Sequence, residues 1–116
     1  MKFGIGLILS VTHERLLTDM DGIYKILNYM TDDNLFTHQL PRASRFCKPF
    51  ILSQYPQLEQ WDEFHHKINE QNWEKYLAKA EEMFGKTLEI DKAPAGVWNY
   101  QDPIEELENM VGKEKV

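Results

Sequence analysis

The 116-residue sequence predicts a small α+β domain that is mostly helical, with about four helices and a small two-stranded sheet. Four segments place apolar residues at helical spacing between capping and stop residues. Two short segments, one at the N-terminus and one near residues 87–91, have the composition of strands. The length suits a single domain over residues 1–116, and a hydrophobic content of 42% is enough to form a core without disulfides.

The first element is predicted to be a buried central strand over residues 2–11. This segment becomes continuously apolar from Leu7 to Leu9, and Gly4 and Gly6 allow a neighbouring backbone to approach closely. The apolar run is far shorter than the roughly 20 residues that cross a membrane. No small-residue cleavage site follows it, so it does not resemble a signal peptide either.

Two helices are predicted in the following third of the chain. The first runs from about residue 19 to 30, with Thr18 or Asp19 at its N-cap. The second begins near Pro41, because proline costs least in a first helical turn. Pro49 lies within it and indicates either a kink or the junction of two short helices. Between residues 57 and 71 the apolar residues follow no clear helical or strand period. Trp61, Phe64 and Ile68 would lie on one face of a helical turn or two.

The C-terminal part contains the two remaining helices and the second strand. Asn72 and Gly85 bound a helix from Trp73 to Phe84, and the segment "KTLEID" over residues 86–91 reads as a strand that pairs with the first. Asp102 and Pro103 then form the N-cap and first position of an acidic helix that ends at Gly112.

The charge distribution and the single cysteine limit the classes of function. Of the 19 acidic residues, 14 follow residue 50, and only seven lysines accompany them there. This half repels nucleic acid and favours a basic partner surface, or it is simply a solvated surface. Cys47 is the only cysteine, so no intrachain disulfide can form; we expect a cytoplasmic protein with Cys47 as a small buried side chain.

Signatures of catalysis and of cofactor binding do not occur in the sequence. It contains no glycine-rich phosphate loop, no zinc-binding helix and no nucleophile elbow. His65 and His66 are adjacent and therefore point in different directions, which disfavours a shared metal. We expect no enzymatic activity, no cofactor and no metal.

A basic cluster at the start of the second helix is the first candidate site. Arg42, Arg45 and Lys48 recur at every third position, and His38 precedes them. Three cations are too few to hold a nucleic acid, but they suit one anion such as a phosphate, a nucleotide or a carboxylate. The alternative is an internal role, in which the basic face pairs with the acidic helix from Asp102 to Glu108, or with Glu81 and Glu82.

The acidic C-terminal segment is the second candidate site. Aromatic anchors and steering carboxylates are typical of a partner-binding surface, and here they are Trp98, Tyr100, Asp102, Glu105, Glu106 and Glu108. The alternative is that the two aromatic side chains only cover the edge of the sheet.

The stretch "YKILNYMTDDNLFTHQLPRA", residues 24–43, resembles a family of short uncharacterised accessory proteins encoded by phages and prophages. Weaker similarities lie at Asn72–Trp73 and at "DPIEEL", residues 102–107. The resemblance covers roughly a third of the chain. It implies an accessory protein of a mobile element that acts inside the host cell, and small acidic proteins of this kind resemble inhibitors of CRISPR effectors.

Three hypotheses of different classes follow. The first is a stoichiometric protein-binding inhibitor of a host defence system, anti-CRISPR-like, whose acidic segment occupies a basic groove of a host protein. The second is a small anion- or nucleotide-binding protein that uses the basic face of residues 41–48. The third is a self-associating structural protein, which would be a homo-oligomer. None of the three requires a membrane or a direct contact with nucleic acid.

Overall fold

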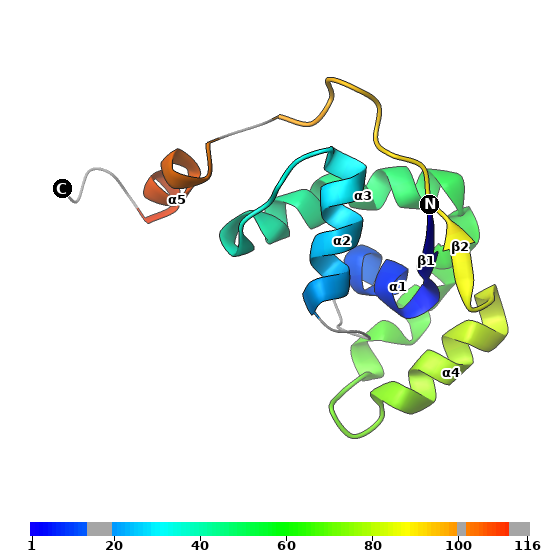
Figure 1. The fold of residues 1–116 in the computed structure, drawn as a ribbon. Helices are drawn as coiled ribbons and strands as arrows, with labels where there is room; N and C mark the ends of the chain where they lie inside the picture. Colours follow the sequence, from blue (N-terminus) through cyan, green and yellow to red (C-terminus); the bar gives the residue numbers. More distant parts are fainter. Residues whose placement is uncertain (14–19, 100–101, 112–116) are drawn as a thin grey trace.

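A computed structural model describes residues 1–13, 20–99 and 102–111, and it confirms a mostly helical α+β fold (Figure 1). A two-stranded antiparallel sheet accompanies the helices in this part of the chain. The elements are, in order, β1 (Lys2–Gly4), α1 (Ile5–His13), α2 (Met20–Thr31), the 3₁₀ helix η1 (Thr37–Gln39), α3 (Leu40–Gln54), the 3₁₀ helices η2 (Pro56–Glu63) and η3 (His65–Lys67), α4 (Trp73–Phe84), β2 (Thr87–Glu89) and α5 (Pro103–Val111).

The predicted strand over residues 2–11 is wrong beyond Gly4, because the chain turns into helix α1 at Ile5. All nine residues of α1 are buried, and the helix packs against α2, α3, α4 and η2. A helix that is covered on every side shows no amphipathic period, so its sequence looks like that of a buried strand. The polar side chain of Ser10 is satisfied within α1 by donating to the carbonyl oxygen of Gly6, 2.7 Å away.

The two predicted helices that follow are confirmed as α2 and α3. Buried residues of α2 recur at helical spacing and are Ile23, Ile26, Leu27, Met30 and Thr31. Helix α3 starts one residue before Pro41 and continues through Pro49 as one helix to Gln54, so two separate short helices do not form. Pro49 has no N–H to donate to the carbonyl oxygen of Arg45, four residues earlier. Because Pro49 is exposed, water can hydrate this carbonyl oxygen instead.

The segment without a clear period forms 3₁₀ helices η2 and η3, which lead into α4. Trp61 is fully buried. The centre of its ring lies 5.4 Å from that of Phe64. The ring centres of two residues of α4 are also near, Tyr76 at 6.3 Å and Phe84 at 6.2 Å. The sequence-predicted α4 is confirmed from Trp73 to Phe84, with Gly85 at its C-cap at a positive φ of 93°. This aromatic cluster joins η2 to α4, and both elements also pack on α1.

The predicted second strand is confirmed as β2, which pairs with β1 in antiparallel register. Phe3 lies opposite Leu88, and Lys2 lies opposite Glu89. The sheet therefore joins the start of the chain to the segment that follows α4. Phe3 is buried, so this short strand anchors the N-terminal side of the core.

Helix α5 lies to one side of the bundle of α1 to α4, and residues 90–99 after β2 contain neither helix nor strand (Figure 1). Its nearest neighbours are η1 and the first turn of α3. Within the described ranges, no helix is both long enough and apolar enough to span a membrane.

Candidate functional site

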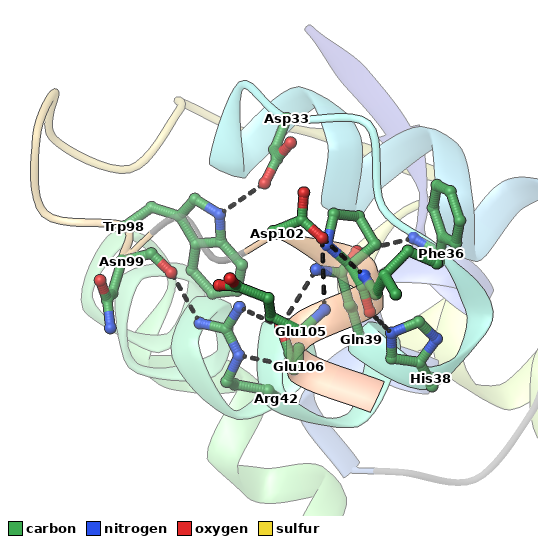
Figure 2. Close-up of polar contacts among 12 residues, drawn as sticks. Asp33, Phe36, His38, Gln39, Arg42, Trp98, Asn99, Asp102, Glu105 and Glu106 are labelled. Carbon is green, nitrogen blue, oxygen red and sulfur yellow. Dashed lines mark hydrogen bonds and ion pairs between the residues drawn. The ribbon is translucent and has the colours of Figure 1, made fainter. Parts of the chain in front are cut away.

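Arg42, in the first turn of α3, binds the carboxylate of Glu106 on α5 (Figure 2). The guanidinium donates from Nε to Oε2 over 3.1 Å and from Nη2 to Oε1 over 2.8 Å, which is the two-pronged geometry that arginine forms with carboxylates. Its Nη1 donates to the carbonyl oxygen of Asn99 over 2.9 Å. One arginine thus holds both α5 and the segment that leads to it.

Gln39 is the second donor to Glu106. Its side chain is buried, its Nε2 donates to Oε1 of Glu106 over 3.0 Å, and its Oε1 accepts from the backbone N–H of Phe36 over 2.9 Å. Glu106 itself is only 5% exposed. The hydrogen bonds from Arg42 lower the pKa of Glu106, and those from Gln39 add to this effect against the opposing effect of burial. Hereafter, Gln39 and Arg42 are called the Arg42 site.

The ring of Trp98 packs against the guanidinium group of Arg42. The Arg42 Cζ atom lies 4.2 Å from the centre of the Trp98 ring, within the range of a cation–π interaction. The ring also packs on Phe46 of α3 at 4.9 Å, and its Nε1 donates to Oδ2 of Asp33 over 3.0 Å. Trp98 is therefore anchored to α3 and to the turn after α2.

Two further contacts position the N-terminus of α5. His38 Nε2 lies 2.7 Å from the carbonyl oxygen of Pro103 and donates to it, since a carbonyl oxygen can only accept. Asp102 is the N-cap: its Oδ1 accepts from the backbone N–H groups of Ile104 over 2.9 Å and of Glu105 over 3.2 Å. The sequence predicts this cap, and the structure confirms it.

The four residues of the predicted anion site have different surroundings in the structure. His38 and Arg42 contact α5, as in the internal pairing that the sequence left open. Arg45 and Lys48 are exposed, and their side chains form no hydrogen bond or ion pair with the residues that the structure describes. Cys47 is fully buried as expected, and burial raises the pKa of its thiol to about 12, so it is not a reactive group.

The residues of the predicted partner-binding surface divide into two groups. Trp98 and Glu106 are used internally, and Asp102 caps the helix. Glu105 and Glu108 are exposed, and Tyr100 lies outside the described residues. Sequence analysis missed Gln39 and Asp33. Gln39 is the last residue of η1, and its side chain accepts from the backbone N–H of Phe36 at the N-cap of that helix, where the sequence lacks the Ser or Thr of a capping box.

An outward surface of α5 carries apolar side chains instead of packing them on the core. Ile104 is 56% exposed, Leu107 is 40% exposed and Met110 is 59% exposed. Their spacing of three residues places them along one side of the helix, and Glu105 and Glu108 are also exposed on α5. We call these five residues the outer face of α5. The helix thus docks through a carboxylate while its apolar side chains remain in water, the reverse of the usual amphipathic arrangement.

Metal binding has no geometric support in this part of the chain. Among residues 1–13, 20–99 and 102–111, no three His, Cys, Asp or Glu side chains are grouped closely enough to hold a metal ion. His65 and His66 lie with their rings 5.7 Å apart and nearly perpendicular.

Comparison with known proteins gives a family but no activity. A family model described as a domain of unknown function, DUF7736, matches residues 3–61. No curated protein and no solved structure matched the chain. The matched region includes His38, Gln39 and Arg42, whereas α5 lies beyond it. Because the match spans half of the sequence, the chain belongs to the DUF7736 family.

Proposed function

We propose that the chain is an accessory protein of a phage or another mobile element that inhibits a host defence effector by binding it stoichiometrically, as anti-CRISPR proteins do. The outer face of α5 is the observation that carries this proposal. Ile104, Leu107 and Met110 are exposed on a docked helix, and the same helix carries the exposed carboxylates of Glu105 and Glu108. Exposed apolar groups within a charged rim are typical of protein-binding surfaces.

The chemistry of the outer face defines the partner. A helix with anchors three residues apart binds into an apolar groove of another protein, and Glu105 and Glu108 complement lysine or arginine side chains along its rim. A defence effector that binds nucleic acid carries lysine and arginine side chains along its binding groove, and these complement the two carboxylates. Electrostatic attraction would increase the rate of association and make it sensitive to salt.

The anion-binding alternative receives less support from the geometry. The paired donors of Arg42 already bind Glu106, and His38 already donates to Pro103. With α5 docked, a free phosphate or nucleotide would have to displace a buried carboxylate. Binding of a protein at the outer face requires no such displacement.

The test separates the outer face from the Arg42 site. Glu105→Lys with Glu108→Lys reverses the outer charge and leaves Glu106 in place. The matched control, Glu74→Lys with Glu82→Lys, makes the same change in net charge at two exposed positions of α4. Each chain is expressed in a panel of bacterial hosts that each carry one defence system, and the plating efficiency of a phage that the system restricts is measured.

We expect the wild-type chain and the α4 control to raise plating efficiency in one host by about tenfold or more. The outer-face variant should restore restriction, and the isolated effector should bind the wild-type chain more weakly at high salt. Equal protection by the outer-face variant would contradict the proposed surface. No protection in any host of a broad panel would contradict the function.

A further inference from the structure

A groove of about 450 Å³ lies where the start of α2, η1 and the first turns of α3 meet α1. Its walls are mainly apolar and are formed by Met20, Ile23, Leu40 and Pro41. Ser44 and Arg45 of α3 add a hydroxyl group and a guanidinium group to the lining. A concave apolar surface of about 300–1,000 Å³ with a few polar groups is typical of a site for a small ligand.

The walls of this groove are held in place by contacts within the protein. The hydroxyl groups of Tyr24 and Thr37 are hydrogen bonded to each other, so η1, which lines the groove through Thr37, is tied to α2. Ile23 and Leu40 are buried members of the hydrophobic core. The groove is therefore preformed, and such prior organisation lowers the cost of binding a ligand.

Arg45 is the charged group in the lining of the groove. Its side chain is exposed and has no hydrogen bond or ion pair to the residues that the structure describes, whereas Arg42 is bound to Glu106. Lys48 lies one turn after Ser44 on the same face of α3 and is exposed as well. Positive charge at the edge of an apolar groove complements a ligand that joins an apolar body to an anionic end.

We propose that the groove binds a small aliphatic carboxylate, such as a medium-chain fatty acid. Its carboxylate pairs with Arg45, because the planar guanidinium offers two parallel N–H donors that match the two oxygens. A carboxylate carries one negative charge, which one arginine neutralises. The aliphatic chain lies against Met20, Ile23 and Leu40. None of these residues belongs to the Arg42 site or to the outer face of α5, so binding does not require α5 to undock.

The apolar part of the site predicts a dependence on chain length. Isothermal titration calorimetry of the full chain with hexanoate, octanoate and decanoate, each below its micelle-forming concentration, measures the affinity. We expect one bound molecule per chain, with a Kd that falls about fourfold for each added CH₂ group until the groove is filled, which corresponds to the ~0.8 kcal/mol of a buried methylene. Saturable binding of none of the three acids overturns the proposal.

The polar part of the site predicts a dependence on the carboxylate. Octylamine and 1-octanol have an aliphatic chain without this group and should bind at least about tenfold more weakly than octanoate, because they lose the charged hydrogen bonds. Equal binding of 1-octanol would mean that the guanidinium does not recognise the ligand, and this outcome also overturns the proposal.

Two variants place the ligand in the groove. Arg45→Gln should weaken octanoate binding at least about tenfold, whereas Lys86→Gln, with the same change in net charge at an exposed position before β2, should bind like the wild-type chain. Ser44→Leu fills the groove from α3 and should abolish binding of all three acids. Circular dichroism verifies that the variants keep their helix content.

Octanoate binding that is unchanged in Arg45→Gln overturns the proposal, because the carboxylate then lies elsewhere. Arg45 is exposed, so this variant gives a result even if Ser44→Leu disturbs the packing of α3. The assay contains no host protein, so its result does not bear on the inhibitor proposal.

Discussion

His13, the last residue of α1, is a titratable side chain buried in the core. Its Nε2 lies 2.6 Å from Oδ1 of Asp62, its Nδ1 lies 2.6 Å from the hydroxyl oxygen of Thr12, and its ring lies 5.3 Å from that of His65. Burial lowers the pKa of His13, and Asp62 opposes this effect without overcoming it. The imidazole is therefore favoured in its neutral form in the folded protein.

This lowered pKa predicts that the protein loses stability when the pH falls. In the unfolded chain His13 takes up a proton near pH 6.5, whereas in the folded protein it does so only at lower pH. The unfolded state then binds more protons, so the free energy of unfolding decreases with acidification from about pH 6.5 downwards. Glu106, whose pKa is lowered below its usual range, contributes its own loss only in more acidic solution.

The measurement is urea unfolding at about pH 7.5 and about pH 5.5, on either side of the histidine pKa. His13→Gln removes the titrating group, so the variant should be less stable at neutral pH but should depend less on pH across this window. His66→Gln, at an exposed position, is the control and should keep the wild-type dependence. An undiminished pH dependence in His13→Gln would show that another group is responsible.

At the scale of the elements, the sequence predicts four of the helices and the second strand because each has local signals. Asn72 and Gly85 bound α4, and Asp102 and Pro103 begin α5. The failure at α1 has the opposite cause: all of its residues are buried, and a continuous apolar run carries no period that distinguishes helix from strand. The sequence leaves open whether the basic face of α3 pairs with the acidic helix α5 or binds an anion. Local patterns do not reveal the pairing, because Arg42 and Glu106 are 64 residues apart in the chain.

The docking of α5 should depend on Arg42 far more than on Arg45. Arg42→Ala leaves the Glu106 carboxylate without its charged partner, and removing one member of a buried ion pair costs about 3–5 kcal/mol if the other stays buried. Undocking lets Glu106 return to water, so the helix should detach rather than bear this cost. Arg45→Ala removes an exposed guanidinium and should leave docking unchanged.

Amide hydrogen exchange followed by mass spectrometry measures this directly. In Arg42→Ala, peptides that contain residues 103–111 should exchange much faster than in the wild-type chain, whereas peptides of α1 should not change. A change in Trp98 fluorescence provides a second readout, because the guanidinium no longer covers its ring. If α5 keeps its protection in Arg42→Ala, contacts other than the Arg42 site hold it.

At the scale of the whole molecule, we expect the cooperative folding unit to be longer than the family match but shorter than the chain. Residues 3–61 include α1 to α3 and most of η2. They lack α4, which packs on α1, and β2, which pairs with β1. The hydrophobic residues that the structure describes as buried extend only to Ile90, and beyond Asn99 Glu106 is the single buried side chain described.

Two truncated chains test how much of the sequence the fold requires. A chain that ends at Asn99 keeps every buried hydrophobic residue described, so it should unfold cooperatively, with a midpoint within about 4 °C of the full chain, equivalent to about 1 kcal/mol for this size. A chain that ends at Trp61 exposes α1 and loses the rings of Tyr76 and Phe84 that pack on Trp61, so it should show no cooperative transition. Thermal unfolding followed by circular dichroism distinguishes the two. Cooperative melting of the shorter chain would mean that the fold does not require α4 and β2. Loss of the cooperative transition in the longer chain would mean that α5 is part of the core.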